Sequence, residues 1–110
     1  MIEKHFKLSA DNIKKLINPI WGCYATDKIT VNGEHVGYMY RETPDSKFDS
    51  GWRFLSGTEN QEYADDPNNW AIYDVNTIAN YDQSIIDYLD YPINSEFERI
   101  PGTNNFKKTC

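Results

Sequence analysis

The sequence predicts a single α+β domain, with a mainly antiparallel sheet of about four to five strands and an N-terminal helix and two later helices packed on it. Three observations predict this class. The 110 residues match the commonest size of one domain. Hydrophobic residues make up 39% of the chain and aromatic residues 15%, which is enough to form a core. The helical and strand patterns follow one another as helix, strands, then helices, unlike the alternation of a parallel βαβ protein.

The N-terminal segment 1–20 carries the first predicted helix, over 10–18, and Pro19 prevents its continuation. Its apolar residues are spaced three and four apart, so they lie on one helical stripe. These residues are Ile13, Leu16 and Ile17. From Trp21 the pattern changes to aromatic and β-branched residues, which predicts a strand to Thr26. Its two faces would be Trp21, Cys23 and Ala25, and Gly22, Tyr24 and Thr26.

Asn32-Gly33 is the strongest hairpin signal in the chain, because both positions tolerate a positive φ. It lies between 29–31 and 36–40, which are rich in β-branched and aromatic residues. These flanks are therefore predicted to pair antiparallel. A further strand over 52–56 follows two clusters of turn residues and carries both of its aromatic side chains on one face.

The segment 58–69 concentrates carboxylates and turn formers without a periodic apolar set, which predicts a loop with one helical turn at most. A strand over 70–73 follows it. Asp74 or Asn76 then caps a helix with one apolar stripe, and Asp82 caps a second. The two stripes are Val75, Ile78 and Ala79, then Ile85, Ile86 and Leu89.

The end of the chain is predicted to be an edge strand over 95–100, after Pro92 ends the last helix. Beyond it, 101–110 is predicted to be a flexible tail.

Charge and targeting signals narrow the classes of partner. Eleven Lys and Arg face 17 Asp and Glu, for a net charge of −6. Nucleic acid is a poor partner for such a chain and a basic protein a better one. No apolar run approaches a membrane span, and Met1-Ile2-Glu3-Lys4-His5 lacks a signal-peptide core, so we expect a cytoplasmic protein. Cys23 and Cys110 are expected to be free thiols.

Motifs for catalysis or cofactor binding do not appear. His5 and His35 lack a companion at metal-ligand spacing, and there is no nucleophile elbow or phosphate-binding glycine loop. The carboxylates of 59–66 offer oxygen atoms to Ca²⁺ but lack the alternating ligand loop with its central glycine, which favours a solvated acidic loop. We therefore expect no cofactor, no metal and no enzymatic activity.

The aromatic residues indicate binding. The three tryptophans are expected mainly in the core, whereas eight tyrosines exceed what a small core can enclose. Tyrosine beside carboxylates suits a protein interface.

Several segments together resemble the bacterial immunity proteins of the family called immunity protein thirty-three. The resemblance runs from about Cys23 to Arg99 and leaves the first helix and the tail outside. Its main segments are 36–42, 49–57 and 72–78, with Glu62-Tyr63, Asp65, Pro67, Asn80-Tyr81-Asp82 and Phe97-Glu98-Arg99. It implies a small α+β protein that protects its own cell by binding the toxin of a polymorphic or contact-dependent system.

The partner-binding surface is expected around the acidic loop, docked by occlusion onto a basic site of the cognate toxin. Its candidate residues are Glu59, Glu62, Tyr63, Asp65, Asp66 and Trp70. A second group is expected to fix the fold as a turn glycine, two core aromatics and a helix cap. These are Gly51, Trp52, Phe54 and Asp74.

Two alternatives of other classes remain open. One is an enzyme or small-ligand protein with an acidic aromatic cleft, if certain aspartates converge. These are Asp49, Asp65, Asp66 and Asp74. The other is an adaptor for a different cytoplasmic protein.

Overall fold

The computed structural model describes residues 4–109; Met1-Ile2-Glu3 and Cys110, with the expected free thiol of Cys110, lie outside them. The 3₁₀ turns are η1 (Ala10–Asn12), η2 (Pro67–Asn69) and η3 (Gln83–Tyr88). The α-helices are α1 (Asp27–Thr30), α2 (Gln61–Asp65) and α3 (Val75–Tyr81). The strands are β1 (Gly22–Thr26), β2 (Tyr38–Arg41), β3 (Asp49–Leu55), β4 (Trp70–Asp74), β5 (Glu96–Arg99) and β6 (Phe106–Lys108).

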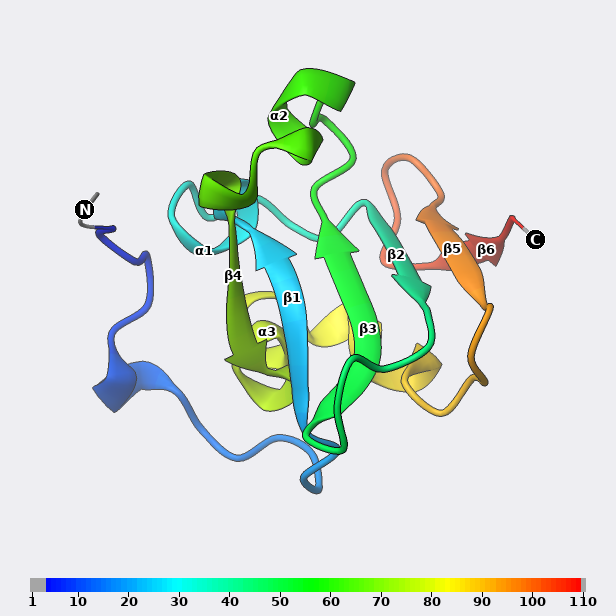
Figure 1. Cartoon of the computed structure of the whole chain (residues 1–110), viewed down its shortest axis with the longest axis horizontal. Coiled ribbons are helices and arrows are strands. Elements are labelled where there is room, and N and C mark those ends of the chain that lie inside the picture. Colours follow the sequence, from blue (N-terminus) through cyan, green and yellow to red (C-terminus); the bar gives the residue numbers. More distant parts are fainter. Residues whose placement is uncertain (1–3, 110) are drawn as a thin grey trace.

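One six-stranded sheet organises the molecule, in the order β4-β1-β3-β2-β5-β6. β1 and β3 pair in parallel, and the other neighbours pair antiparallel. The α+β class is confirmed, but the sheet is mixed and has more strands than expected. The parallel pair arises because α1 and β2 intervene in the chain between β1 and β3, and β2 then lies on the far side of β3 (Figure 1).

The core lies between one face of this sheet and α3 with η3, which lie behind the sheet in Figure 1. Trp52 and Phe54 of β3 are fully buried in it and stack at 6.1 Å. The indole nitrogen of Trp52 donates to the Leu89 carbonyl, so the largest core side chain leaves no unpaired donor. Asp74 occupies the N-cap position of α3, but its side chain makes no capping hydrogen bond.

The predicted hairpin at Asn32-Gly33 is wrong. Residues 27–30 form the short helix α1, and the chain leaves it through Gly33 at φ 79°. The Gly33 amide donates to the Ile29 carbonyl and the Glu34 amide to the Lys28 carbonyl, at 3.0 and 2.9 Å. The Asn-Gly pair thus supplies the left-handed residue that ends a helix, a use that the sequence pattern does not distinguish from a hairpin turn. β2 pairs instead with β3 and β5.

The predicted helix over 10–18 is also wrong, since only the three residues of η1 are helical. The segment after η1 is held by side chains of α3. Asn76 Oδ1 accepts from the Leu16 and Ile17 amides, and Asn80 Oδ1 accepts from the Lys14 amide, at 2.8 to 3.2 Å. These amide side chains satisfy the backbone in place of helical hydrogen bonds.

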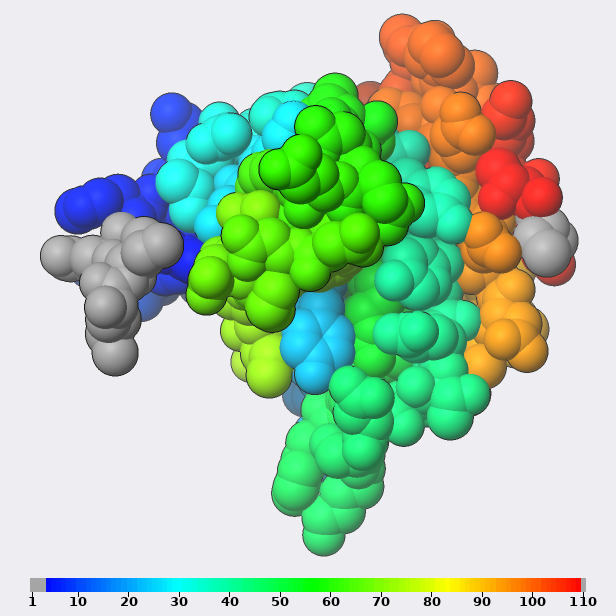
Figure 2. All heavy atoms as spheres, turned by 45° about the horizontal axis from the view of Figure 1, so that its top comes forward, coloured from blue at the N-terminus to red at the C-terminus, as the bar shows by residue number. Residues whose placement is uncertain are grey.

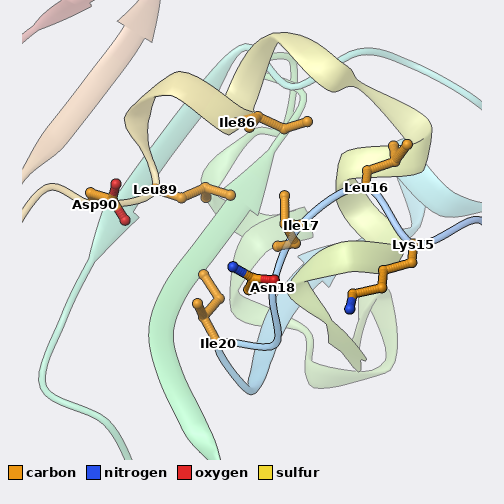
Figure 3. A pocket seen from close by; sticks show the side chains of 8 residues that line it. All are labelled: Lys15, Leu16, Ile17, Asn18, Ile20, Ile86, Leu89 and Asp90. Carbon is orange, nitrogen blue, oxygen red and sulfur yellow. The ribbon is translucent and has the colours of Figure 1, made fainter.

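The apolar residues of this segment face η3 across a shallow hollow (Figure 3). Ile17 and Ile20 point towards Ile86 and Leu89, and Lys15 and Asp90 lie at opposite sides. The stripe that predicts a helix therefore does mark a partly buried side, but of a non-helical segment.

The predicted tail contains a strand. β6 pairs antiparallel with β5 and buries Phe106, so β5 is an inner strand and β6 the edge. A strand of three residues with one apolar side chain carries almost no periodic signal. The second later helix is 3₁₀ rather than α, although Asp82 caps it as predicted by accepting from the Ser84 amide at 3.1 Å.

Asp82 also joins the sheet to the helices. Its buried carboxylate accepts from the Val36 amide and pairs with Arg99 of β5. Arg99 in turn donates to the carbonyls of Val36 and Thr103. Three segments far apart in sequence thus meet at one ion pair.

Asp82→Ala should lower the free energy of unfolding by about 3–5 kcal/mol, because it leaves the Arg99 charge unpaired and three donors unsatisfied. Asp87→Ala, at an exposed aspartate of the same turn, should change it by less than about 0.5 kcal/mol. Urea denaturation of both variants checks this, and equal losses would contradict the role given to Asp82.

Candidate functional site

The second face of the sheet carries no helix across its centre and faces the viewer in Figure 1. One cross-strand row crosses it from β4 to β5. The row is Ile72, Tyr24, Arg53, Tyr40 and Glu96. Tyr38 lies beside Tyr40 with ring centroids 5.7 Å apart, and its hydroxyl donates to Glu96. Three of the eight tyrosines, Tyr24, Tyr38 and Tyr40, thus gather on this open face.

Arg53 is the buried charge at the centre of the open face, with only 2% of its surface exposed. Two of its guanidinium nitrogens donate to the two oxygens of Asp49, at 2.9 and 2.8 Å. Nε donates to Glu42 at 2.5 Å, and the Tyr24 ring lies 4.4 Å from the guanidinium carbon. All sides of this cation are therefore occupied by carboxylates, a ring or the sheet.

A bulge in β3 brings Asp49 to Arg53. Gly22 of β1 is opposite Asp49, whereas Tyr24 is opposite Arg53, so four steps on β3 match two on β1. Gly51, between them, has φ 89°, and a Cβ there would lie 2.2 Å from the Glu42 carbonyl oxygen. Only glycine fits this position, and the bulge shortens the distance across which the ion pair forms.

The ion pair also orders the loop between β2 and β3. Asp49 accepts from the amides of Asp45 and Gly51 at 2.8 and 2.9 Å. The hydrogen bonds from Arg53, more than these backbone donors, hold the pKa of Asp49 far below its usual range. Asp45 stays exposed and accepts from the Tyr24 hydroxyl at 3.0 Å, which raises the pKa of Tyr24.

An exposed apolar cluster of Trp21, Phe48 and Ile72 adjoins this loop; we call it the Trp21 cluster. The exposed fractions are 56%, 58% and 70%. The Trp21 and Phe48 rings meet edge to face at 5.5 Å. Ile72 lies over Gly22, where an added Cβ would be 3.7 Å from Ile72 Cγ2. The expectation that tryptophans lie mainly in the core is wrong for Trp21.

Trp21 has φ 79°, which is rare for a bulky residue. The flanking peptide groups require it: the Trp21 carbonyl accepts from Val75, and the Gly22 amide donates to Phe48. A glycine would meet the same requirement without the penalty of about 1 kcal/mol that a side chain adds there. No sequence signal reveals this, because Trp-Gly reads as the start of a strand.

The expected partner-binding residues divide into two groups. Glu59 is committed to the fold: its carboxylate accepts from Thr26 Oγ1 and from the amides of Ser56 and Gly57. Burial opposes ionisation of Glu59, but these hydrogen bonds hold its pKa below the usual value. Glu62 and Asp65 of α2 are exposed.

The remaining three are Tyr63 within α2, and Asp66 and Trp70 after it. Asp66 is exposed and caps η2 by accepting from the Asn68 amide. Tyr63 is half-buried under the Lys28 ammonium, and the Trp70 indole donates to the Ala64 carbonyl at 2.8 Å. An apolar recess below α2 connects Trp70 with Tyr24 and Ile72. The acidic loop and the open face are thus one continuous surface, and Figure 2 shows β1 exposed between α2 and the projecting β2–β3 loop.

The four aspartates of the proposed cleft do not converge. Asp49 and Asp74 flank Gly22 at one end of β1, whereas Asp65 and Asp66 precede Trp70, which pairs with Thr26 at the other end. Within residues 4–109, no group of three or more histidine, cysteine or carboxylate side chains could hold a metal ion. Cys23 is buried, and this burial raises the pKa of its thiol.

Asp49 should make the protein acid-sensitive. Its folded-state pKa is depressed, so its stabilisation is full above the unfolded pKa of about 3.9 and is lost as the pH falls towards the folded value. Asp49→Asn should cost about 2–3 kcal/mol at pH 7 and flatten the decline of stability below about pH 4. The control is Asp90→Asn, at an exposed site. Urea midpoints from pH 2 to 7 measure the stability of both variants. If the midpoints of the wild type and of Asp49→Asn fall in parallel as the pH is lowered, Asp49 is not the source of the acid sensitivity.

None of the described helices is long and apolar enough to span a bilayer. Searches of curated proteins and of solved structures found no match to the chain. One protein family does match, over residues 23–110, and it is described as Immunity protein Imm33 domain. The match includes β6 and the rest of the segment expected to be a tail, and it excludes the N-terminal segment. This chain belongs to the Imm33 immunity protein family.

Proposed function

We propose that this protein neutralises a cognate toxin in the cytoplasm by binding it, through the open face of the sheet and the adjoining acidic helix α2. Family membership is the observation that carries the role. The surface supports the mode of binding, because it combines exposed carboxylates with tyrosines and a tryptophan on a rigid sheet. Interfaces use such aromatic anchors for affinity and complementary charges for orientation and association rate.

The partner is a protein with a basic contact site. Glu62, Asp65 and Asp66 project from α2 and η2, and no cation within hydrogen-bonding distance neutralises them among the described residues. The negative electrostatic potential of these carboxylates repels nucleic acid and anionic membrane surfaces and attracts Lys or Arg side chains. Occlusion of the toxin, rather than any chemistry on it, is the mechanism.

Growth protection tests the role directly. The products of the genes neighbouring this one are expressed one at a time, and the cognate toxin domain should arrest growth alone and be tolerated when this protein is co-expressed. A pull-down of a catalytically inactive form of that domain should be stoichiometric and should weaken as salt rises. Arrest despite co-expression, with no complex in the pull-down, would refute the proposal.

Charge reversal tests the surface. The double variant Glu62→Lys and Asp65→Lys should reduce affinity for the toxin domain by about tenfold or more, chiefly through a slower association rate. Both residues are exposed, so the melting temperature should stay near that of the wild type. The matched control reverses Asp87 and Asp90 on the opposite side, and calorimetry compares the two. Equal effects of both double variants would exclude α2 from the interface.

A further inference from the structure

We propose that the Trp21 cluster and the recess beside it form the centre of the toxin interface and receive a Lys or Arg side chain of the toxin. This inference rests on the proposed function and adds the location of its main anchor. It concerns residues that sequence reasoning assigned to the core or left unassigned.

The recess has the shape and chemistry for one long basic side chain. It holds about 170 Å³, the space of several water molecules. Phe48, Ile72 and Tyr24 form apolar walls, and Asp45 and Asp49 lie at its edge. Lys and Arg side chains bury an aliphatic stem and keep a charged head at a polar site, which matches this arrangement.

Charge selects a basic protein as the occupant. Four carboxylates lie on or beside the strands and the loop that border the recess. They are Glu42, Asp45, Asp49 and Asp74. Two cations oppose them there: Arg53 is buried and fully paired, and the Lys47 ammonium lies 5.1 Å from the centre of the Phe48 ring. A second copy of this chain would bring the same acidic residues face to face, and an anionic membrane would be repelled as well.

The side chain at position 21 is a second, independent observation. The backbone conformation there is one that glycine adopts freely, yet the position holds a tryptophan with 56% of its surface exposed. The aromatic partner of the indole is Phe48, which is itself exposed, and neither residue belongs to the buried core. Tryptophan is the residue type most enriched among interface anchors, so a contact with a partner accounts for it.

The hollow between the N-terminal segment and η3 is a weaker candidate. Its apolar residues Leu16, Ile17, Ile20 and Ile86 already pack against the buried core and are only partly exposed (Figure 3).

The test uses the full chain and the purified, catalytically inactive toxin domain that the growth-protection experiment identifies. Trp21→Gly, Phe48→Ala and Ile72→Ala should each weaken binding by about tenfold or more, mainly by faster dissociation. Ile100→Ala is the matched control, an exposed isoleucine near the opposite edge, and should change affinity by less than about twofold. Trp21→Gly should melt within about 4 °C of the wild type, because glycine suits the backbone there.

Two further measurements separate an anchor from a general surface effect. Acrylamide should quench the fluorescence of Trp21, identified as the component that Trp21→Gly lacks, in the free protein but not in the complex. Asp45→Asn should weaken binding and reduce its salt dependence, whereas Asp87→Asn should do neither.

The outcomes distinguish this inference from the role on which it rests. If the wild type binds the toxin domain but the three cluster variants bind equally well and Trp21 stays quenchable, the cluster is not the anchor and the proposed function stands. If the wild type does not bind at all, both fail. A dimer of the free protein that Ile72→Ala dissociates, or capture by anionic vesicles that Trp21→Gly abolishes, would also overturn the inference.

Discussion

The ion pair between Asp49 and Arg53 is the interaction on which the open face depends. A guanidinium buried in a sheet is strongly destabilising unless its hydrogen bonds are met, and here Asp49 meets two of them from the same strand. In a regular strand these residues would be about 13 Å apart. The bulge at Gly51 closes that distance, so a backbone feature and an electrostatic feature of β3 require each other.

The same pair determines what the surface presents. Asp49 fixes the loop after β2 through the Asp45 amide, and Phe48 precedes Asp49 directly in sequence. Arg53 holds Glu42 in place and supports the ring of Tyr24, whose hydroxyl donates to Asp45. The guanidinium of Arg53 pairs with Glu42 and lies 3.9 Å from Asp45, so these exposed carboxylates are held at fixed positions beside it. Such preorganisation lowers the entropy that binding would otherwise cost.

Residues with strong local patterns made the fold class predictable, and residues whose role depends on distant partners did not. Strands β1 and β4 and helix α3 follow from strand and helix patterns, and the structure has them, although β1 begins at Gly22 and not at Trp21. The N-terminal stripe misled because Asn76 and Asn80, about 60 positions away, satisfy that backbone. The Asn-Gly signal misled because it specifies a positive φ and not the element that uses it.

The functional surface likewise combines features that the sequence predicts with features that depend on distant partners. Acidity and surplus tyrosine indicate a binding surface, and the carboxylates of α2 are exposed as that reading requires. The sequence does not reveal that Glu59 accepts hydrogen bonds from Ser56 and Gly57, because it looks like any other glutamate in an acidic loop. The Trp21 cluster joins residues from three separate segments through strand pairing alone, and periodicity holds no information on that pairing.

Two residues with positive φ show how stability and binding divide across this face. At Gly51 no side chain fits, because the Glu42 carbonyl occupies the place of a Cβ; the position serves the fold. At position 21 a side chain fits but adds strain, and the chain carries the largest one, directed at solvent. Selection for stability alone would favour glycine at both. The proposed contact of the indole with a partner would account for this difference: Trp21 precedes β1 at one end of the sheet, whereas Gly51 lies within β3 and serves the ion pair.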